Sequence, residues 1–425
     1  MRVVGKLLSL KRNKTIINGA LFSIFSFFGQ GVSFVLLIIL AKYILPEEYG
    51  YLSLFTTITS ILSIIFGLGT SGYNGTIFFK ESRTSFNKYF TAVFLLNIFA
   101  IIPYSLILLI CGSFLSEMLS LQLNVLYMAG FLVIFNKCFS FHQELYRLHE
   151  NLKMYGILSC SNAIMNFITA LFFVVYLQLN WIGRIYSLIT YSAIYAIIAC
   201  IYFQKNHYID FSGLKQRVLP VLKWGLPLVP HLAANWIKNG LDRYIINDCH
   251  GTYEVGIFSF ALNLTSVIIA IGVAFNNSNS VTLFQLLSSD MPFENKIKDI
   301  NKSTKEFLWI YVVISTIIIL LGSIFTPLLF SNYKSSVPFF IILGIYGFLQ
   351  CVYFLYCNFF FYFGMTKQLM FITFFSAILH LSLSIIFTRF SLYLTAMIYL
   401  ISMGVVDYLV ISRARKMLSQ INLFK

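Results

Sequence analysis

Long apolar segments follow one another along this chain of 425 residues, with only short polar stretches between them. A helix needs about 20 mostly apolar residues to cross the hydrocarbon core of a bilayer. The pattern therefore predicts about twelve spanning helices. Their expected bounds are 16–41, 50–68, 89–112, 122–141, 155–177, 183–203, 224–246, 256–284, 306–329, 337–362, 369–388 and 392–412.

Composition and charge narrow the class further. The chain is 59% hydrophobic and 11% charged, with a mean hydropathy of +0.82, which excludes a water-soluble protein of this size. A net charge of +15 would suit a nucleic-acid-binding protein, but most of the 30 lysines and arginines lie in the two tails and in alternate loops. These regions share one side of the membrane, whereas the other side has Lys42, Arg184, Lys334 and Arg389. We therefore expect a multi-pass membrane protein with both termini cytoplasmic, contacts to anionic lipid and no nucleic-acid partner.

Sequence motifs for catalysis are missing. The chain has no Walker loop, no Gly-x-Ser-x-Gly nucleophile and no cluster with metal-ligand spacing. Its seven cysteines fit neither a disulfide framework nor a zinc site. The first apolar segment lacks a small-residue cleavage site, so we interpret it as a retained helix. We expect no enzymatic activity, no metal and no cofactor.

A short motif recurs in the two halves of the chain. The pattern Glu-x-Gly-x-x-Ser occupies residues 48–53 and again residues 254–259, each at the start of a predicted helix. We interpret this as a parallel repeat of six helices, which places a cavity between two lobes. The expected domains are an N-terminal lobe (1–203), a cytoplasmic linker (204–223) and a C-terminal lobe (224–425). A chance match between apolar segments is the alternative.

The predicted helix 224–246 has the strongest polar signal. A charged side chain at the centre of a spanning helix costs roughly 2.5–3.5 kcal/mol, so such residues usually face a partner or a water-filled cavity. Four polar residues at steps of four, three and four share one face of this helix: His231, Asn235, Lys238 and Asp242. Pro227 and Pro230 should bend or loosen the helix. In the alternative interpretation, Lys238 only pairs with Asp242 and extends to the membrane edge.

Other polar residues lie inside predicted spans. Amide side chains without a partner are costly there, and the candidates for a cavity wall are Asn263, Asn277 and Gln30. Lys137 is either a cavity residue or a side chain that extends to the cytoplasmic edge. Asp407 is either a protonatable site or a buried structural group. We expect His380 to be hydrogen-bonded within the bundle.

Several motifs resemble those of the Wzx-type polysaccharide flippases, which belong to the multidrug/oligosaccharidyl-lipid/polysaccharide exporter superfamily. In the first half they are Ala41–Tyr51, which includes Pro46, and Gly67-Leu-Gly69. In the second half they are Gly225-Leu-Pro227-Leu228, Asp242-Arg243-Tyr244-Ile245 and residues 254–259. The resemblance extends over nearly the whole chain, and it depends on the order and spacing of motifs that are individually weak.

The resemblance implies two six-helix lobes around a central cavity that opens alternately to each side of a bacterial inner membrane. The implied substrate is an oligosaccharide on undecaprenyl pyrophosphate, the repeat unit of an O-antigen or a similar glycan. A pyrophosphate needs cations in a cavity of low dielectric constant, and Lys238 and Arg243 are best placed to supply them. Coupling to H+ or Na+ would use Asp242 or Asp407. A polymerase and a chain-length regulator of the same pathway would be protein partners.

Three alternatives remain open at this point. A cation-coupled multidrug antiporter of the same superfamily is the nearest, although some of these antiporters use an acid in the first helix, which this chain lacks. A membrane-embedded glycan polymerase or ligase is another, but these typically have a sizeable periplasmic loop. A scaffold without transport activity would not need a charged face on the helix 224–246.

Overall fold

The computed structural model describes residues 25, 28–289 and 291–419, and within this part the chain is helical and has no strand. Ten helical segments of this part are long and apolar enough to cross a membrane. They are Pro46–Gly67, Arg83–Leu119, Leu123–Leu148, Leu152–Tyr176, Asn180–Lys205, Thr252–Ser288, Phe293–Leu329, Ser331–Tyr362, Thr366–Phe387 and Leu392–Ser419. The expected all-α multi-pass membrane fold is therefore confirmed.

Two of the twelve predicted spans differ from these ten. The span 16–41 lies partly outside the described residues, and its described part includes the apolar helix Phe28–Leu40. The span 224–246 is an interrupted helix, as its prolines predicted. Its successive pieces are the end of α9 (Leu214–Gly225), a 3-10 turn (Leu226–Leu228), α10 (Val229–Trp236), a π-helical turn (Ile237–Leu241) and α11 (Asp242–His250).

The chain forms two compact units. The first unit comprises residues 1–44 and 54–233, and the second comprises residues 45–53 and 234–425. The predicted linker 204–223 is not an open loop, because it contains most of α9, which packs on α4 (Arg83–Phe99) within the first unit. Residues 45–53, from the first half of the sequence, belong to the second unit.

Packed aromatic rings form the core of the first unit. Its central helices are α6 (Leu123–Leu148), α7 (Leu152–Ala170) and α8 (Asn180–Lys205), and α6 packs extensively on α8. Phe90 of α4 is fully buried and contacts Phe203 of α8 edge-on, with 5.2 Å between ring centroids. Such edge-to-face pairs add about 0.5–1.5 kcal/mol beyond area burial.

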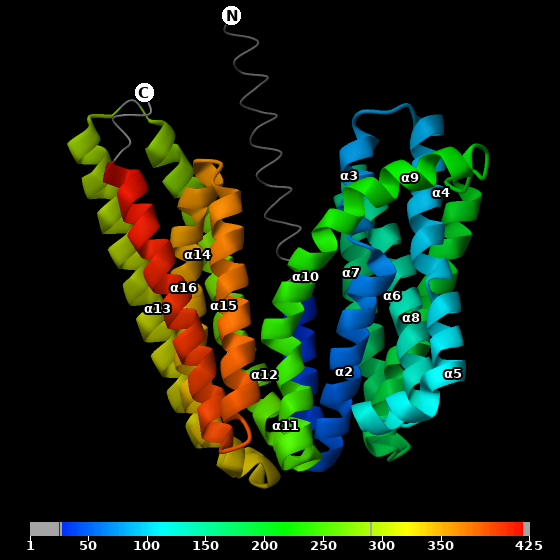
Figure 1. Cartoon of the computed structure of the whole chain (residues 1–425), viewed down its shortest axis with the longest axis horizontal. Coiled ribbons are helices and arrows are strands. Elements are labelled where there is room, and N and C mark those ends of the chain that lie inside the picture. The colour runs from blue at the N-terminus through cyan, green and yellow to red at the C-terminus, as the bar shows by residue number, and fades with distance from the viewer. Residues whose placement is uncertain (1–24, 26–27, 290, 420–425) are drawn as a thin grey trace, which may run out of the picture. The chain divides into compact units, whose positions relative to one another are not determined.

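The second unit is built around α14 (Val337–Tyr362). This helix packs on α12 (Thr252–Ser288), α13 (Phe293–Leu329) and α16 (Leu392–Ser419), and α15 (Thr366–Phe387) packs on α16. Figure 1 shows α13 to α16 side by side as long, nearly parallel or antiparallel rods. At one end of this unit, the buried ammonium group of Lys296 donates to the carbonyl oxygens of Leu287 (3.0 Å) and Ser289 (2.8 Å), so it caps the end of α12.

The two copies of the repeated motif contact each other within the second unit. The first turns of α2 (Pro46–Gly67) cross the first turns of α12, and a glycine of each helix faces the backbone of the other. A Cβ atom at Gly50 would overlap the carbonyl oxygen of Thr252, and one at Gly256 would overlap that of Pro46. One turn further, the hydroxyl of Ser53 donates to that of Ser259 at 2.6 Å. Small residues at both positions therefore allow a close helix crossing.

Gly256→Ala tests this crossing. We expect it to lower the stability of the folded protein by about 1–3 kcal/mol, the usual cost of overpacking, because the new methyl group meets backbone that cannot move aside. The measurement is the thermal unfolding of the purified protein in detergent. The control is Gly404→Ala in α16, where a Cβ has no heavy atom within 4 Å among the described residues. Equal melting temperatures for the two variants would contradict the prediction.

Candidate functional site

A polar pocket lies in the first unit, between α2, α6 and α7, with a volume of about 280 Å³. Most of its lining comes from one face of α6, where polar residues recur every three or four positions, as the helical period requires. This face has Asn136, Lys137, Ser140, Gln143, Glu144 and Arg147, and the neighbouring helices add Ser63 and Tyr155.

The polar face is accessible although α6 is a spanning helix. Asn136 and Ser140 are exposed, and Lys137 is partly buried. Amide, hydroxyl and ammonium groups are costly against hydrocarbon, so a spanning helix usually directs them into a bundle or a water-filled cavity. We therefore interpret the pocket as part of an aqueous cavity and not as a lipid-facing surface.

Neighbouring helices hold the two amides of the pocket. Ser192 of α8 donates to Oδ1 of Asn136 at 2.9 Å, and the amide of Gln143 donates to the hydroxyl of Ser159 in α7 at 2.7 Å. These bonds fix the orientation of both side chains. A pre-oriented amide loses less conformational entropy when it binds a polar ligand.

The two cations of the pocket differ in their charge partners. Arg147 lies 3.7 Å from the carboxylate of Glu144, which also accepts a hydrogen bond from Asn74 at 3.1 Å. Among the described residues, Lys137 has no carboxylate within the 4.0 Å of an ion pair. Among the described residues of the pocket, Lys137 is therefore the cation whose charge is available to an anionic ligand.

Glycines of the predicted Gly67-Leu-Gly69 motif make room for this cation. A Cβ atom at Gly67 would lie 2.8 Å from Nζ of Lys137, so a larger residue would displace the ammonium group. Gly69 has a φ of 68°, which favours glycine, and its Cβ would overlap the carbonyl oxygen of Gly225. The two motifs that contain Gly67, Gly69 and Gly225 thus meet within the first unit.

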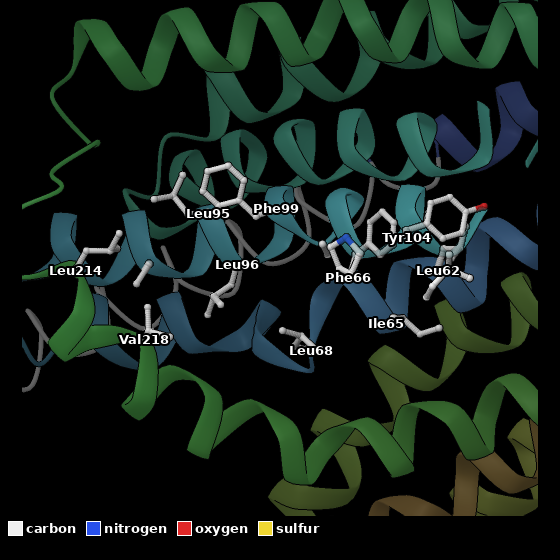
Figure 2. Close-up of a pocket in the computed structure, with 14 residues that line it drawn as sticks. Leu62, Ile65, Phe66, Leu68, Leu95, Leu96, Phe99, Tyr104, Leu214 and Val218 are labelled. Atoms are coloured by element: carbon white, nitrogen blue, oxygen red, sulfur yellow. The ribbon is translucent and has the colours of Figure 1, made fainter. Parts of the chain in front are cut away.

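A second pocket of the first unit is apolar, with a volume of about 510 Å³. Figure 2 shows side chains of α2, α4, α5 (Ile101–Leu119) and α9 around it, among them Phe66, Phe99 and Val218. The hydroxyl of Tyr104 also lines this pocket, but it donates to the carbonyl oxygen of Leu126 at 2.8 Å. This pocket suits hydrocarbon and has no group for a phosphate.

The second unit contains a buried polar network around Asp242. Its carboxylate accepts hydrogen bonds from the ring of His380 at 2.8 Å and from the hydroxyl of Ser384 at 2.6 Å, both on α15. The other ring nitrogen of His380 lies 3.0 Å from the hydroxyl of Ser402 on α16. All four residues are at most 1% exposed. These bonds tie α11 to α15 and α16 inside the second unit.

The remaining predicted site residues fall into three groups. The side chains of His231, Asn235 and Lys238 lie outside the described residues, so their predicted roles stay predictions. Gln30 and Asn277 are exposed within helices. Arg243 donates to the hydroxyl of Ser259 at 3.2 Å, and Asn263 donates to the hydroxyl of Tyr49, so both lie near the crossing of α2 and α12. Asp407 is buried on α16.

Sequence reasoning missed most of the pocket around Lys137. The predicted span 122–141 ends before Arg147, whereas α6 continues to Leu148 and has Arg147 in its last turn. The missed signal is the spacing of Lys137, Ser140, Glu144 and Arg147 at steps of three, four and three. It is the same kind of pattern that identified the polar face of the span 224–246.

Comparisons with known proteins agree with this architecture. A profile of a family described as "Polysaccharide biosynthesis protein" matches residues 17–284. The capsular polysaccharide biosynthesis protein CapF of Staphylococcus aureus is 23% identical over 308 residues, which cover 70% of this chain and 73% of CapF.

Solved transporters have the same fold. The lipid II flippase MurJ, in an inward closed conformation, aligns with a TM-score of 0.74 at 15% identity, over 95% of this chain and 90% of MurJ. An inward-facing multidrug resistance transporter of the MATE family in the MOP superfamily aligns with a TM-score of 0.67 at 14% identity, over 92% of this chain and 94% of the transporter. The two-lobe fold of the multidrug/oligosaccharidyl-lipid/polysaccharide exporter superfamily is thus confirmed.

Asp242→Ala tests the buried network. We expect a marked loss of stability, because the ring of His380 and the hydroxyl of Ser384 lose their acceptor, and each buried polar group left without a partner costs about 1–3 kcal/mol. Thermal unfolding in detergent gives the loss. Asp248→Ala is the matched control, because Asp248 is an exposed acid on the same helix. If both variants unfold at the same temperature, the network does not stabilise the second unit.

Proposed function

This chain belongs to the polysaccharide biosynthesis protein family, and on that basis we propose that it carries a lipid-linked oligosaccharide across the membrane. The proposed substrate is a glycan repeat unit on undecaprenyl pyrophosphate, for the assembly of O-antigen or a related surface polysaccharide. The proposed location is the bacterial inner membrane, with both termini cytoplasmic. The similarity to a capsular polysaccharide protein and to the fold of a lipid II flippase supports this proposal.

The observation that carries the proposal is the pocket around Lys137. An ammonium group without a carboxylate partner attracts a diphosphate, and charge-assisted hydrogen bonds to phosphate are roughly twice as strong as neutral ones. The fixed amides of Asn136 and Gln143 supply partners for sugar hydroxyls. A pocket with a cation and several hydroxyl groups favours a glycan attached to a diphosphate over a cationic drug. Transporters of the MATE family have the same fold, so this preference has to come from the residues of the pocket.

The proposed mechanism is alternating access. The diphosphate binds Lys137 while the pocket is open to the cytoplasm, and the hydrocarbon tail remains in the bilayer. A change of conformation then exposes the head group to the opposite side. Polymerisation of the product on that side would lower its concentration and so favour net transport. A polymerase and a chain-length regulator are therefore the proposed partners.

Proton coupling is part of the proposal. Asp242 and His380 are buried and hydrogen-bonded to each other, so protonation changes the charge inside the second unit. Burial of an unpaired charge is costly. The pair would therefore favour different conformations in its two protonation states, which is what coupling to a proton gradient requires.

A chromosomal deletion tests the function itself. We expect loss of surface glycan and accumulation of single lipid-linked repeat units on the cytoplasmic face, seen by glycan staining and by analysis of the lipid-linked intermediates. Single units on the periplasmic face would instead indicate a polymerase. Unchanged glycan together with drug sensitivity would indicate an antiporter.

Lys137→Ala tests the pocket. We expect at least a tenfold decrease of surface glycan in a deletion strain that expresses the variant, because the diphosphate loses its main cation. Protein abundance should stay normal, since Lys137 has no carboxylate partner among the described residues. The matched control is Lys153→Ala, which removes an exposed lysine of α7 in the same unit. Wild-type glycan in both variants would refute the anion site.

Asp242→Asn, His380→Gln and Asp407→Asn test coupling. We expect the first two variants to lose the pH dependence of transport, because neither can exchange a proton within the pair. Asp407→Asn examines the second predicted coupling residue separately. The measurement is transport into vesicles at several external pH values, with Asp248→Asn as the control. Unchanged transport across the pH range would remove a residue from the coupling mechanism.

A further inference from the structure

The apolar pocket of the first unit is elongated along the helices that line it. Its wall on α4 and α5 extends from Ala92 through Ala100 to Ile107 at helical spacing. The ends of this wall are about 22 Å apart along the helix axis. Figure 2 shows Leu214 at one end of the row of side chains and Tyr104 at the other end. A pocket of this length, with a volume of about 510 Å³, suits one extended hydrocarbon chain.

The rim of the apolar pocket faces lipid. Three side chains of its lining are about half exposed, namely Ile65 (50%), Phe99 (55%) and Ile107 (51%). Ile110, three positions further along α5, is 80% exposed. Exposed apolar side chains on spanning helices contact lipid tails, which are as apolar as leucine. A hydrocarbon chain can therefore enter this pocket directly from the bilayer.

The lining of the pocket accepts hydrocarbon but does not choose among lipids. The hydroxyl of Tyr104 is already bound to the carbonyl oxygen of Leu126, so it selects no polar ligand. Moving a chain from the bilayer into the pocket gains nothing from the hydrophobic effect, because both surroundings are apolar. A preference for one lipid must therefore come from the head group.

Two lysines lie at the Leu214 end of the pocket. Lys88 is one turn before Ala92 and shares its face of α4. Lys215 follows Leu214 in α9 and is exposed. The apolar sequence of α4 begins directly after Lys88, which places this end of the pocket at the level of the lipid head groups. Basic residues on helices at a membrane surface attract anionic lipids.

The neighbouring charges leave this end of the pocket positive. Arg217 of α9 donates to the hydroxyl of Tyr89 in α4 at 2.7 Å, and its guanidinium carbon lies 4.5 Å from the ring centroid. Neither α4 nor α9 contains an acid. The carboxylate of Asp210, in the loop before α9, lies near Lys88. The cations of the two helices outnumber this acid, so their charge complements an anionic head group.

We propose that the apolar pocket binds one acyl chain of an anionic phospholipid, with the phosphate beside Lys88 and Lys215. The lipid is a fixed component of the first unit and not the transported substrate. It fills the space between α9 and the helices α2, α4 and α5, and it adds to the contact between Arg217 and Tyr89. Because α9 leads into the 3-10 turn Leu226–Leu228, the lipid holds the start of the interrupted helix in place.

Lys88→Gln combined with Lys215→Gln tests the head-group site. We expect the wild-type protein to bind phosphatidylglycerol at least tenfold more tightly than phosphatidylcholine, measured by native mass spectrometry of the purified full chain titrated with each lipid. The double variant should reduce this ratio below threefold, because its charge no longer complements the phosphate. The control is Lys153→Gln combined with Lys298→Gln, two exposed lysines outside α4 and α9. A ratio near one in the wild type, or a ratio retained in the Lys88 and Lys215 variant, would overturn the proposal.

Ala100→Phe tests the site of the chain. The larger side chain fills the pocket without a change of charge, so we expect at least tenfold weaker binding of phosphatidylglycerol. The control is Ile110→Phe, which enlarges an exposed side chain of α5 outside the pocket lining. Equal binding by these two variants would overturn the proposal. If Ala100→Phe lowers the melting temperature of the lipid-free protein, the lysine variants alone decide.

Undecaprenyl diphosphate is the competing occupant of the pocket. We expect it to displace phosphatidylglycerol from the wild-type protein no better than phosphatidylcholine does. Displacement at least tenfold more effective, and lost in Ala100→Phe, would assign the pocket to the tail of the transported lipid and overturn the phospholipid site. The proposed function depends on Lys137 and not on this pocket, so it stands or fails with the glycan of Lys137→Ala.

Discussion

A bilayer offers polar side chains no hydrogen-bond partners, and the two units of this protein meet that constraint in different ways. In the second unit the buried carboxylate of Asp242 is satisfied internally, since it accepts hydrogen bonds from His380 and Ser384. The first unit leaves a face of α6 exposed, including Asn136 and Ser140. The second unit thus encloses a polar network whose hydrogen bonds are made within the protein, whereas the first unit presents a polar face to its surroundings.

Glycines allow the close contacts that position the polar groups in both units. Gly50 and Gly256 let two helices approach to backbone contact, and Gly67 lets the ammonium group of Lys137 lie against the end of α2. Side chains on rigid, closely packed helices hold their positions better than those on loops. The motifs that indicated the family are therefore positions of close approach, and Lys137 and Ser259 lie next to them.

The helices were predictable from the sequence, but their partners were not. Apolar length alone predicted ten of the spans, and the prolines predicted the interruption near residue 226. His380 was expected to be hydrogen-bonded within the bundle, and this is confirmed. Its partner Asp242 is 138 positions away, a separation that no helical period encodes. The polar face around Lys137 follows the helical period and was therefore predictable from the sequence. Arg147 belongs to this face, but it also fits the positive-inside rule. That rule alone explains a basic residue at the cytoplasmic end of a span, and the spacing to Lys137 was overlooked.

The crossing of α2 and α12 has a consequence for how the protein is made. The hydroxyls of Ser53 and Ser259 that meet there are 206 positions apart. At a synthesis rate of roughly 5–20 residues per second, the first turns of α2 leave the ribosome about 10–40 s before their partner exists. During that interval a bare glycine and a serine hydroxyl lie without α12 beside them. This crossing can therefore form only after α12 has been made, so the packing of the first turns of α2 is completed late in synthesis.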